Sequence, residues 1–207
     1  MARDRGSIVK MSRREGYALH PKAHKALVKR TSKPGQNPQS RGPRGGKTSQ
    51  YALQLREKQK VKRLYGLLER QFSNLMKEAS RRQGQSGQIL LQLLEQRADN
   101  VIYRAGFAPS RRAARQLMTH GHFTLNDVRV DVPSIRLRPG DILTARPHSL
   151  KTEYFKNLDD VSPPPSEIPG WLKADRKKIT VSITGSPSRD DAEPDINEQL
   201  IVEYYSR

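Results

Sequence analysis

The sequence predicts an α+β protein in which a helical domain precedes a small domain built on an antiparallel sheet, with a basic extended arm at the N-terminus. Three observations predict this order. Residues 49–106 carry apolar residues at helical spacing. From residue 123 onward, apolar residues alternate with polar ones, which is typical of strands. Residues 1–48 are rich in Gly, Pro, Ser and basic residues, a composition that favours an extended chain.

The positive charge of the chain is concentrated in its first 150 residues. The 207 residues hold 39 Lys and Arg against 21 Asp and Glu, a formal net charge of +18. Residues 1–150 carry a net charge of +21, and residues 151–207 carry −3. A compact domain with this charge repels itself unless a polyanion neutralises it, and nucleic acid is the expected polyanion. A membrane surface is the weaker alternative, because no apolar anchor accompanies the basic segments.

The N-terminal arm, residues 1–48, is expected to contain at most one short helix, near residues 23–29. It has too little apolar surface to offset its ordering entropy alone, so we expect it to become ordered on nucleic acid. Near its end, glycines let the backbone come close to phosphate groups beside three basic residues, which are Arg41, Arg44 and Lys47.

Three helices are expected after the arm. The first begins at residue 48 or 49 and ends before Gly66, and the second follows and stops near Gly84. The third carries its apolar stripe from Leu90 to Val101 and ends by Gly106. On the first helix, three basic residues share one face and are candidates for nucleic-acid contact, or else plain solubilising groups: Arg56, Lys60 and Arg63.

A fourth, short helix carries the strongest cluster of basic residues. Ser110 is a suitable N-cap, and Gly121 stands where a left-handed residue commonly ends a helix. Its apolar stripe leaves three guanidinium groups on the other faces, and such forks suit phosphate oxygens: Arg111, Arg112 and Arg115. The alternative is a solvated helix face, which we consider less favoured because the helix contains no acidic residue.

The sheet is expected to begin directly after this helix. Residues 123–125 and 128–130 alternate around Asn126-Asp127, a dipeptide that tolerates the positive φ of a hairpin turn. Further strands are expected at residues 135–137, 142–144 and 179–183. Residues 163–169 are proline-rich and predict a stiff connection, after which Trp171-Leu172 is expected to anchor the chain on a core.

The residue inventory argues against an enzyme, a metal site and a cofactor. The chain has no cysteine, and His20 and His24 stand without a carboxylate cluster. Residues 45–48 imitate the end of a phosphate-binding loop, but Arg41 replaces the required glycine and no apolar strand precedes it. No nucleophile arrangement or carboxylate pair is apparent. No apolar run is long enough to span a membrane.

Residues 108–126, from Ala-Pro-Ser-Arg-Arg to Thr-Leu-Asn, resemble the small RNA-binding domain named after bacterial small-subunit ribosomal protein number four. The resemblance continues upstream through residues 93–107 and downstream through residues 131–141. Outside that domain, residues 51–60 (Tyr-Ala-Leu-Gln-Leu-Arg-Glu-Lys-Gln-Lys) are similar to the signature helix of that ribosomal protein family, and residues 196–207 are similar to its C-terminus.

The resemblance implies a domain plan. Residues 1–48 would be the arm, and residues 49–92 the helical domain, with residues 196–207 packed back on it. Residues 93–195 would form the RNA-binding domain, with a helical RNA-binding hairpin in a core module at about 96–160. Many relatives carry a zinc-binding cysteine cluster near the N-terminus, where Val9 and Ser12 stand here, so this chain is a cysteine-free variant.

The resemblance also implies a function. Members bind small-subunit ribosomal RNA, nucleate assembly of the subunit body and influence translational accuracy. Implied partners are small-subunit ribosomal protein five, neighbouring ribosomal proteins and messenger RNA near its entry path, with no membrane or small-molecule substrate. The expected location is the small ribosomal subunit in the cytoplasm, with an organellar ribosome left open.

The RNA-binding candidates are therefore Arg41, Arg44, Lys47, Arg56, Lys60, Arg63, Arg111, Arg112, Arg115, Gln116, His120 and Arg138. Two alternatives use the same domain: an RNA-binding module that acts off the ribosome, and an RNA-modifying enzyme. An off-ribosome module would lack the helix at residues 51–60. An enzyme would need a separate catalytic domain, for which the remaining residues are too few and too basic.

Overall fold

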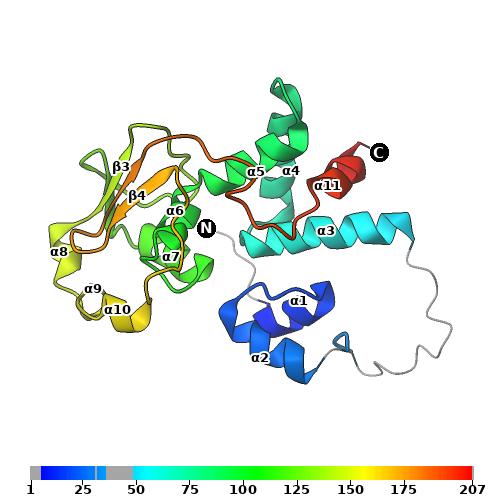
Figure 1. The fold of residues 1–207 in the computed structure, drawn as a ribbon, viewed down its shortest axis with the longest axis horizontal. Helices are drawn as coiled ribbons and strands as arrows, with labels where there is room; N and C mark the ends of the chain where they lie inside the picture. The colour runs from blue at the N-terminus through cyan, green and yellow to red at the C-terminus, as the bar shows by residue number, and fades with distance from the viewer. Residues whose placement is uncertain (1–5, 31, 36–48, 207) are drawn as a thin grey trace. The chain divides into compact units, whose positions relative to one another are not determined.

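The computed structural model describes residues 6–30, 32–35 and 49–206, and these form eleven helices and five strands. Two compact units are present (Figure 1). The first comprises residues 1–87 with 195–207, and the second comprises residues 88–194. The mixed helical and antiparallel fold class predicted from the sequence is confirmed.

The first unit is helical. Its elements are α1 (Ile8–Glu15), α2 (Pro21–Lys29), α3 (Gln50–Leu64), α4 (Glu69–Arg81), the start of α5 (Ser86–Glu95), and α11 (Glu198–Tyr205). The Ser49 hydroxyl accepts a hydrogen bond from the Ala52 amide at 3.2 Å, and Gly66 follows α3 with φ +66°. The predicted beginning and end of this helix are therefore confirmed.

Helices α1 and α2 correct the expectation of an extended arm. Residues 8–15 and 21–29 are helical and pack together, with Met11, Leu19 and Ala23 buried. The short helix predicted near residues 23–29 is confirmed. The first helix was missed because its few apolar residues are separated by basic ones, so its single buried face gives a weak pattern.

Helix α11 packs against α3, which is where the family resemblance places the C-terminal residues. Ile201 is fully buried, and Gln54 of α3 donates to the Glu203 carboxylate at 2.8 Å. At the end of α11, the Tyr205 hydroxyl donates to the Glu69 carboxylate at 3.0 Å. The last segment is thus joined to the helical unit by both apolar and polar contacts.

The ionised carboxylate of Glu69 stabilises the first unit, and this stabilisation should be lost in acid. Burial alone raises the pKa of its carboxyl group, but hydrogen bonds from Lys58, Lys62 and Tyr205 outweigh burial and lower the pKa from 4.5 to about 2. Because the folded state prefers the ionised form, this contribution is complete above pH 4.5 and is lost as the pH falls towards 2. The wild type should therefore have a higher unfolding free energy than Glu69→Gln above pH 4.5, and this difference should shrink as the pH falls towards 2. A difference that stays constant would contradict this account.

The second unit is built on a five-stranded antiparallel sheet in the order β2-β1-β3-β5-β4. The strands are β1 (Phe123–Leu125), β2 (Val128–Val130), β3 (Ile142–Ala145), β4 (Leu172–Asp175) and β5 (Thr180–Ile183). After the end of α5 come α6 (Ala98–Arg104), α7 (Arg111–Thr119), and three single turns, α8 (Pro147–Leu150), α9 (Glu153–Lys156) and α10 (Leu158–Val161).

The hairpin between β1 and β2 is confirmed. Asn126 and Asp127 have φ values of +48° and +67°, and Phe123 lies opposite Val130 in the register. The core of this unit lies between the sheet and the pair α6–α7 and includes Val101, Ile102, Ala114, Leu117, Met118, Phe123, Leu143 and Val181. Trp171 is also buried in it, as predicted, although the following strand β4 was not predicted.

Two predicted elements are wrong. The expected third helix is split, because α5 ends at Glu95 and α6 begins at Ala98. Between them, Arg97 has an extended backbone and forms an isolated β-bridge with Arg136. Residues 135–137 were expected to be a strand of the sheet, but they pair instead with this break. The apolar pattern runs continuously through residues 90–101, so it does not reveal the break.

Gly106 should tolerate no side chain. It has φ +76°, and an added Cβ would lie 2.4 Å from the Cδ atom of Pro165. Its carbonyl accepts hydrogen bonds from Ser162 and Arg176, which fixes the backbone there. Gly106→Ala should lower the unfolding free energy by about 1–3 kcal/mol. Gly66→Ala is the control, because Gly66 has φ +66° with nothing within 4 Å, and an equal loss from both variants would contradict the predicted clash.

Candidate nucleic-acid interface

Helix α7 forms where the sequence predicts it, and its ends are set by local signals. The Ser110 hydroxyl accepts from the Ala113 amide at 3.2 Å, and Gly121 follows the helix with φ +69°. Leu117 and Met118 are buried on one side. The helix therefore holds its polar side chains in fixed directions.

The polar residues of α7 fall into two groups. Arg112, Gln116 and His120, the residue that caps the C-terminus of α7, are exposed and lie at successive helical turns, so they form a single row. Arg111 and Arg115 have side chains that are only 11% and 13% exposed, and both contact carboxylates. These acidic partners come from outside the helix, which is why the helix sequence alone gave no sign of them.

Arg115 reaches a buried ion pair at the start of α6. Asp99 accepts two hydrogen bonds from Arg97, at 3.0 and 2.8 Å, and lies 3.4 Å from Arg115 Nη1. The side chains of Arg97 and Asp99 are each 6% exposed. This arrangement ties α7 to α6 and to the break before it.

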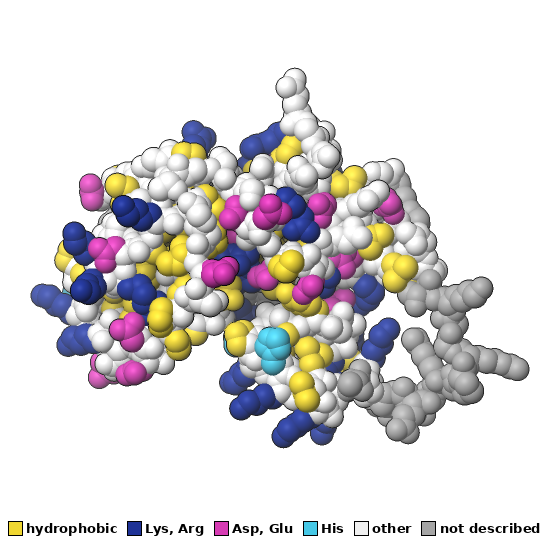
Figure 2. All heavy atoms as spheres, in the orientation of Figure 1, with side chains coloured by type: hydrophobic (Ala, Val, Ile, Leu, Met, Phe, Trp, Pro, Cys, Tyr) yellow, Lys and Arg dark blue, Asp and Glu magenta, His cyan; other side chains and the backbone are white. Residues whose placement is uncertain are grey.

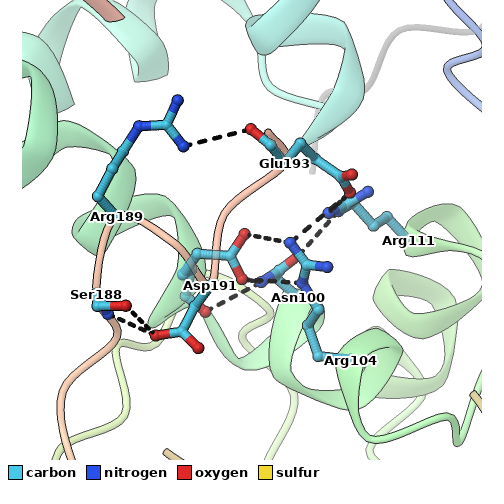
Figure 3. Close-up of polar contacts among 8 residues, drawn as sticks. Asn100, Arg104, Arg111, Ser188, Arg189, Asp191 and Glu193 are labelled. Carbon is cyan, nitrogen blue, oxygen red and sulfur yellow. Dashed lines mark hydrogen bonds and ion pairs between the residues drawn. The ribbon is translucent and has the colours of Figure 1, made fainter. Parts of the chain in front are cut away.

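Arg111 belongs to a second polar network (Figure 3). Its Nε donates to Asn100 Oδ1 at 2.8 Å, its Nη2 donates to Glu193 Oε1 at 3.0 Å, and its guanidinium lies 4.6 Å from the centre of the Tyr103 ring. Beneath it, the fully buried Glu95 accepts from Asn100 at 2.7 Å and from Arg104 at 2.9 and 3.1 Å.

The acidic members of these networks were not predicted from the sequence. Glu95 follows an apolar stripe, and a carboxylate in such a position needs a buried partner, so a signal was present. Glu193 gave no comparable signal, because the residues around it are polar or small and form no apolar stripe.

Further basic and imidazole groups surround the end of α7. Arg146 donates to the Gly121 carbonyl at 3.2 Å, and His122 shares a hydrogen bond with Ser149 at 3.0 Å. Burial lowers the pKa of His122, and the charges of His120, Arg146 and His148 lower it further. His122 therefore favours its neutral form here. The predicted site residue Arg138 is exposed in the turn before β3.

On α3, the three predicted basic residues contact other parts of the first unit. Arg56 lies 3.2 Å from Glu15 of α1, and Arg63 pairs with the same carboxylate. Burial raises the pKa of Glu15, whose side chain is fully buried, while the two guanidinium groups act in the opposite direction. Lys60 donates to the carbonyl of Asp195 at 2.7 Å and pairs with Glu57 at 2.8 Å. Arg56 is the most exposed of the three, at 38%.

The remaining candidates, Arg41, Arg44 and Lys47, lie outside the described residues. Within the described part of the chain, no group of His, Cys, Asp and Glu is arranged to hold a metal ion. No helix among the described residues is long and apolar enough to cross a membrane. Figure 2 shows Lys and Arg gathered around α1 and α2, whereas over the strands and α8 they alternate with Asp and Glu.

Two family descriptions match this chain in succession. The ribosomal protein S4/S9 N-terminal domain matches residues 3–95, and the S4 domain matches residues 96–143. The boundary between them falls at the break between α5 and α6, so the S4 domain match contains α6, α7 and the first strands of the sheet.

Relatives match the chain over its whole length. A protein of Chloroherpeton thalassium named small ribosomal subunit protein uS4 is 48% identical over 207 residues, and the match covers 100% of both chains. Proteins with the same name from Chlorobaculum tepidum and Clostridioides difficile are 49% and 47% identical, again over 100% of both chains. This chain belongs to the family of small ribosomal subunit protein uS4.

Proposed function

We propose that this chain is a structural, non-enzymatic constituent of the small ribosomal subunit that binds small-subunit ribosomal RNA directly. The observation that carries the proposal is the exposed row Arg112, Gln116 and His120, set on a helix whose other two arginines are held by internal carboxylates. A guanidinium, an amide and an imidazole can all bond to phosphate and sugar oxygens. The family membership and the names of the full-length relatives support the same function.

Recognition should depend on the shape of folded RNA and the positions of its phosphates, because the deep groove of A-form RNA does not admit side chains. Basic side chains that contact phosphates release counterions. With about six such contacts, affinity should fall by roughly a thousandfold between 50 and 200 mM salt.

The other candidate residues differ in their exposure and in the partners that they contact in the structure. Arg138 is exposed, and Arg56 is 38% exposed although it pairs with Glu15, so both could contact phosphate without losing a partner. The less exposed residues would exchange or share their present partners: Lys60, Arg63, Arg111 and Arg115. Arg41, Arg44 and Lys47 are proposed contacts from the glycine-rich segment on sequence grounds alone.

From the resemblance, we further propose that binding nucleates assembly of the subunit body and affects translational accuracy. Contacts with small-subunit ribosomal protein five and with messenger RNA near its entry path belong to the same proposal. An off-ribosome module or an RNA-modifying enzyme is not favoured, because the relatives named small ribosomal subunit protein match over the full length of both chains.

Competition binding tests this function. The full-length chain is titrated with small-subunit ribosomal RNA in the presence of an unrelated structured RNA of similar length, at several salt concentrations. We expect a preference for the ribosomal RNA that persists at moderate salt. Equal binding of both RNAs at every salt concentration would overturn the proposal.

A further inference from the structure

Glu193 places a carboxylate between arginines of two consecutive helices. Its Oε1 lies 3.0 Å from Arg111 Nη2 of α7 and 3.7 Å from Arg104 Nη2 of α6 (Figure 3). Glu193 has a side chain 22% exposed, against 18% for Arg104, 11% for Arg111 and none for Glu95 beneath them. The carboxylate therefore lies on the outer side of this cluster.

The two guanidinium groups are positioned without Glu193. Arg104 is held by both oxygens of the buried Glu95, at 2.9 and 3.1 Å. Arg111 is held by Asn100 at 2.8 Å and by the face of Tyr103. If the Glu193 carboxylate moved away, the two cationic groups would keep their positions and form a preorganised anion site.

The segment that carries Glu193 has local contacts of its own. The amide and hydroxyl of Ser188 donate to the Asp191 carboxylate at 2.6 and 2.8 Å, and Arg189 Nη1 lies 3.5 Å from the Glu193 carbonyl. Ala192 is buried, whereas Pro194 is exposed. The segment can thus keep its local turn while the Glu193 side chain exchanges its partner.

We propose that the pair Arg104–Arg111 forms a phosphate subsite for RNA and that the Glu193 carboxylate occupies this subsite when RNA is absent. A carboxylate and a phosphodiester both offer two acceptor oxygens and one negative charge to a guanidinium fork. RNA that binds at α7 would displace Glu193 and place a phosphate between the same two arginines. This inference rests on the proposed function only in that RNA phosphates reach α7.

The subsite predicts that removing the charge of Glu193 strengthens RNA binding. For Glu193→Gln, which keeps an acceptor oxygen for Arg111, we expect the affinity for small-subunit ribosomal RNA to rise by about two- to fivefold, the range of a partly exposed ion pair. The salt dependence should steepen by up to about 0.9 in slope, because one phosphate contact no longer competes with a carboxylate.

A matched control separates this effect from general charge. Asp190→Asn makes the same change in net charge on an exposed residue of the same segment, so it should raise affinity much less. In an Arg111→Ala background, Glu193→Gln should produce no gain, because the subsite is then incomplete. Thermal unfolding of each variant checks that the folded state is retained.

The outcomes are distinct. A loss of affinity in Glu193→Gln would assign Glu193 a positioning role and overturn the proposal, as would a gain equal to that of Asp190→Asn or a gain that survives Arg111→Ala. All variants are also titrated with an unrelated structured RNA. If wild type binds both RNAs equally, the proposed function fails, yet the ratio between Glu193→Gln and wild type still decides the subsite.

Discussion

Asp99→Ala should lower the unfolding free energy of the second unit by about 3–5 kcal/mol, the range expected when one partner of a buried ion pair is removed. The substitution leaves the Arg97 guanidinium, only 6% exposed, without its two hydrogen bonds at 3.0 and 2.8 Å. It also removes the acceptor near Arg115. Trp171 is the single tryptophan of the chain and is buried in this unit, so its fluorescence during urea unfolding measures the effect.

Two comparisons test the cause of that loss. Glu78→Ala removes an exposed i,i+4 partner of Arg82 on α4 and should cost no more than about 0.5 kcal/mol. A double replacement, Arg97→Met with Asp99→Leu, removes both charges and should recover most of the stability. If Asp99→Ala cost as little as Glu78→Ala, the assigned role of the buried pair would be wrong.

Replacing Arg112, Gln116 and His120 together by Ala should weaken binding to small-subunit ribosomal RNA by tenfold or more. A hydrogen bond to a charged group contributes about 1.5–3 kcal/mol, so the loss of Arg112 alone accounts for roughly this factor. The salt dependence should become shallower by about one phosphate contact. Because the three side chains are exposed, the unfolding free energy should stay within about 0.5 kcal/mol of wild type.

The same measurement separates the two groups of α7 residues. Arg111→Ala and Arg115→Ala should lower both affinity and stability, because these side chains are held by Glu193 and Asp99. Lys156→Ala is the charge-matched control on an exposed residue of α9. A loss of affinity in that control as large as in the triple variant would mean that RNA binding follows net charge rather than the row on α7.

Elements set by local interactions could be predicted from the sequence. Helix α7 follows from the cap at Ser110, a continuous apolar stripe and Gly121, all within a dozen residues. The hairpin follows from Asn126-Asp127, since both residues adopt positive φ at the turn. In each case the deciding contact joins residues close in the chain, so the local sequence pattern is enough to predict the element.

Elements set by distant contacts could not be predicted. The break between α5 and α6 depends on the bridge from Arg97 to Arg136. The division of the α7 arginines depends on Asp99 and Glu193, which reach them only after the chain has folded. The sequence therefore predicted which helix carries the basic residues, but not which of its arginines would be largely buried against carboxylates.

A tethered probe tests most directly whether the exposed row on α7 meets RNA. Because the chain has no cysteine, Gln116→Cys provides a single attachment point for an iron chelate that cleaves nearby RNA by hydroxyl radicals. Asp160→Cys, exposed on α10, is the control position. In the complex with small-subunit ribosomal RNA, we predict strong cleavage confined to a few sites from position 116 and weak cleavage from position 160. RNA that stays bound but is not cleaved from position 116 would contradict the account.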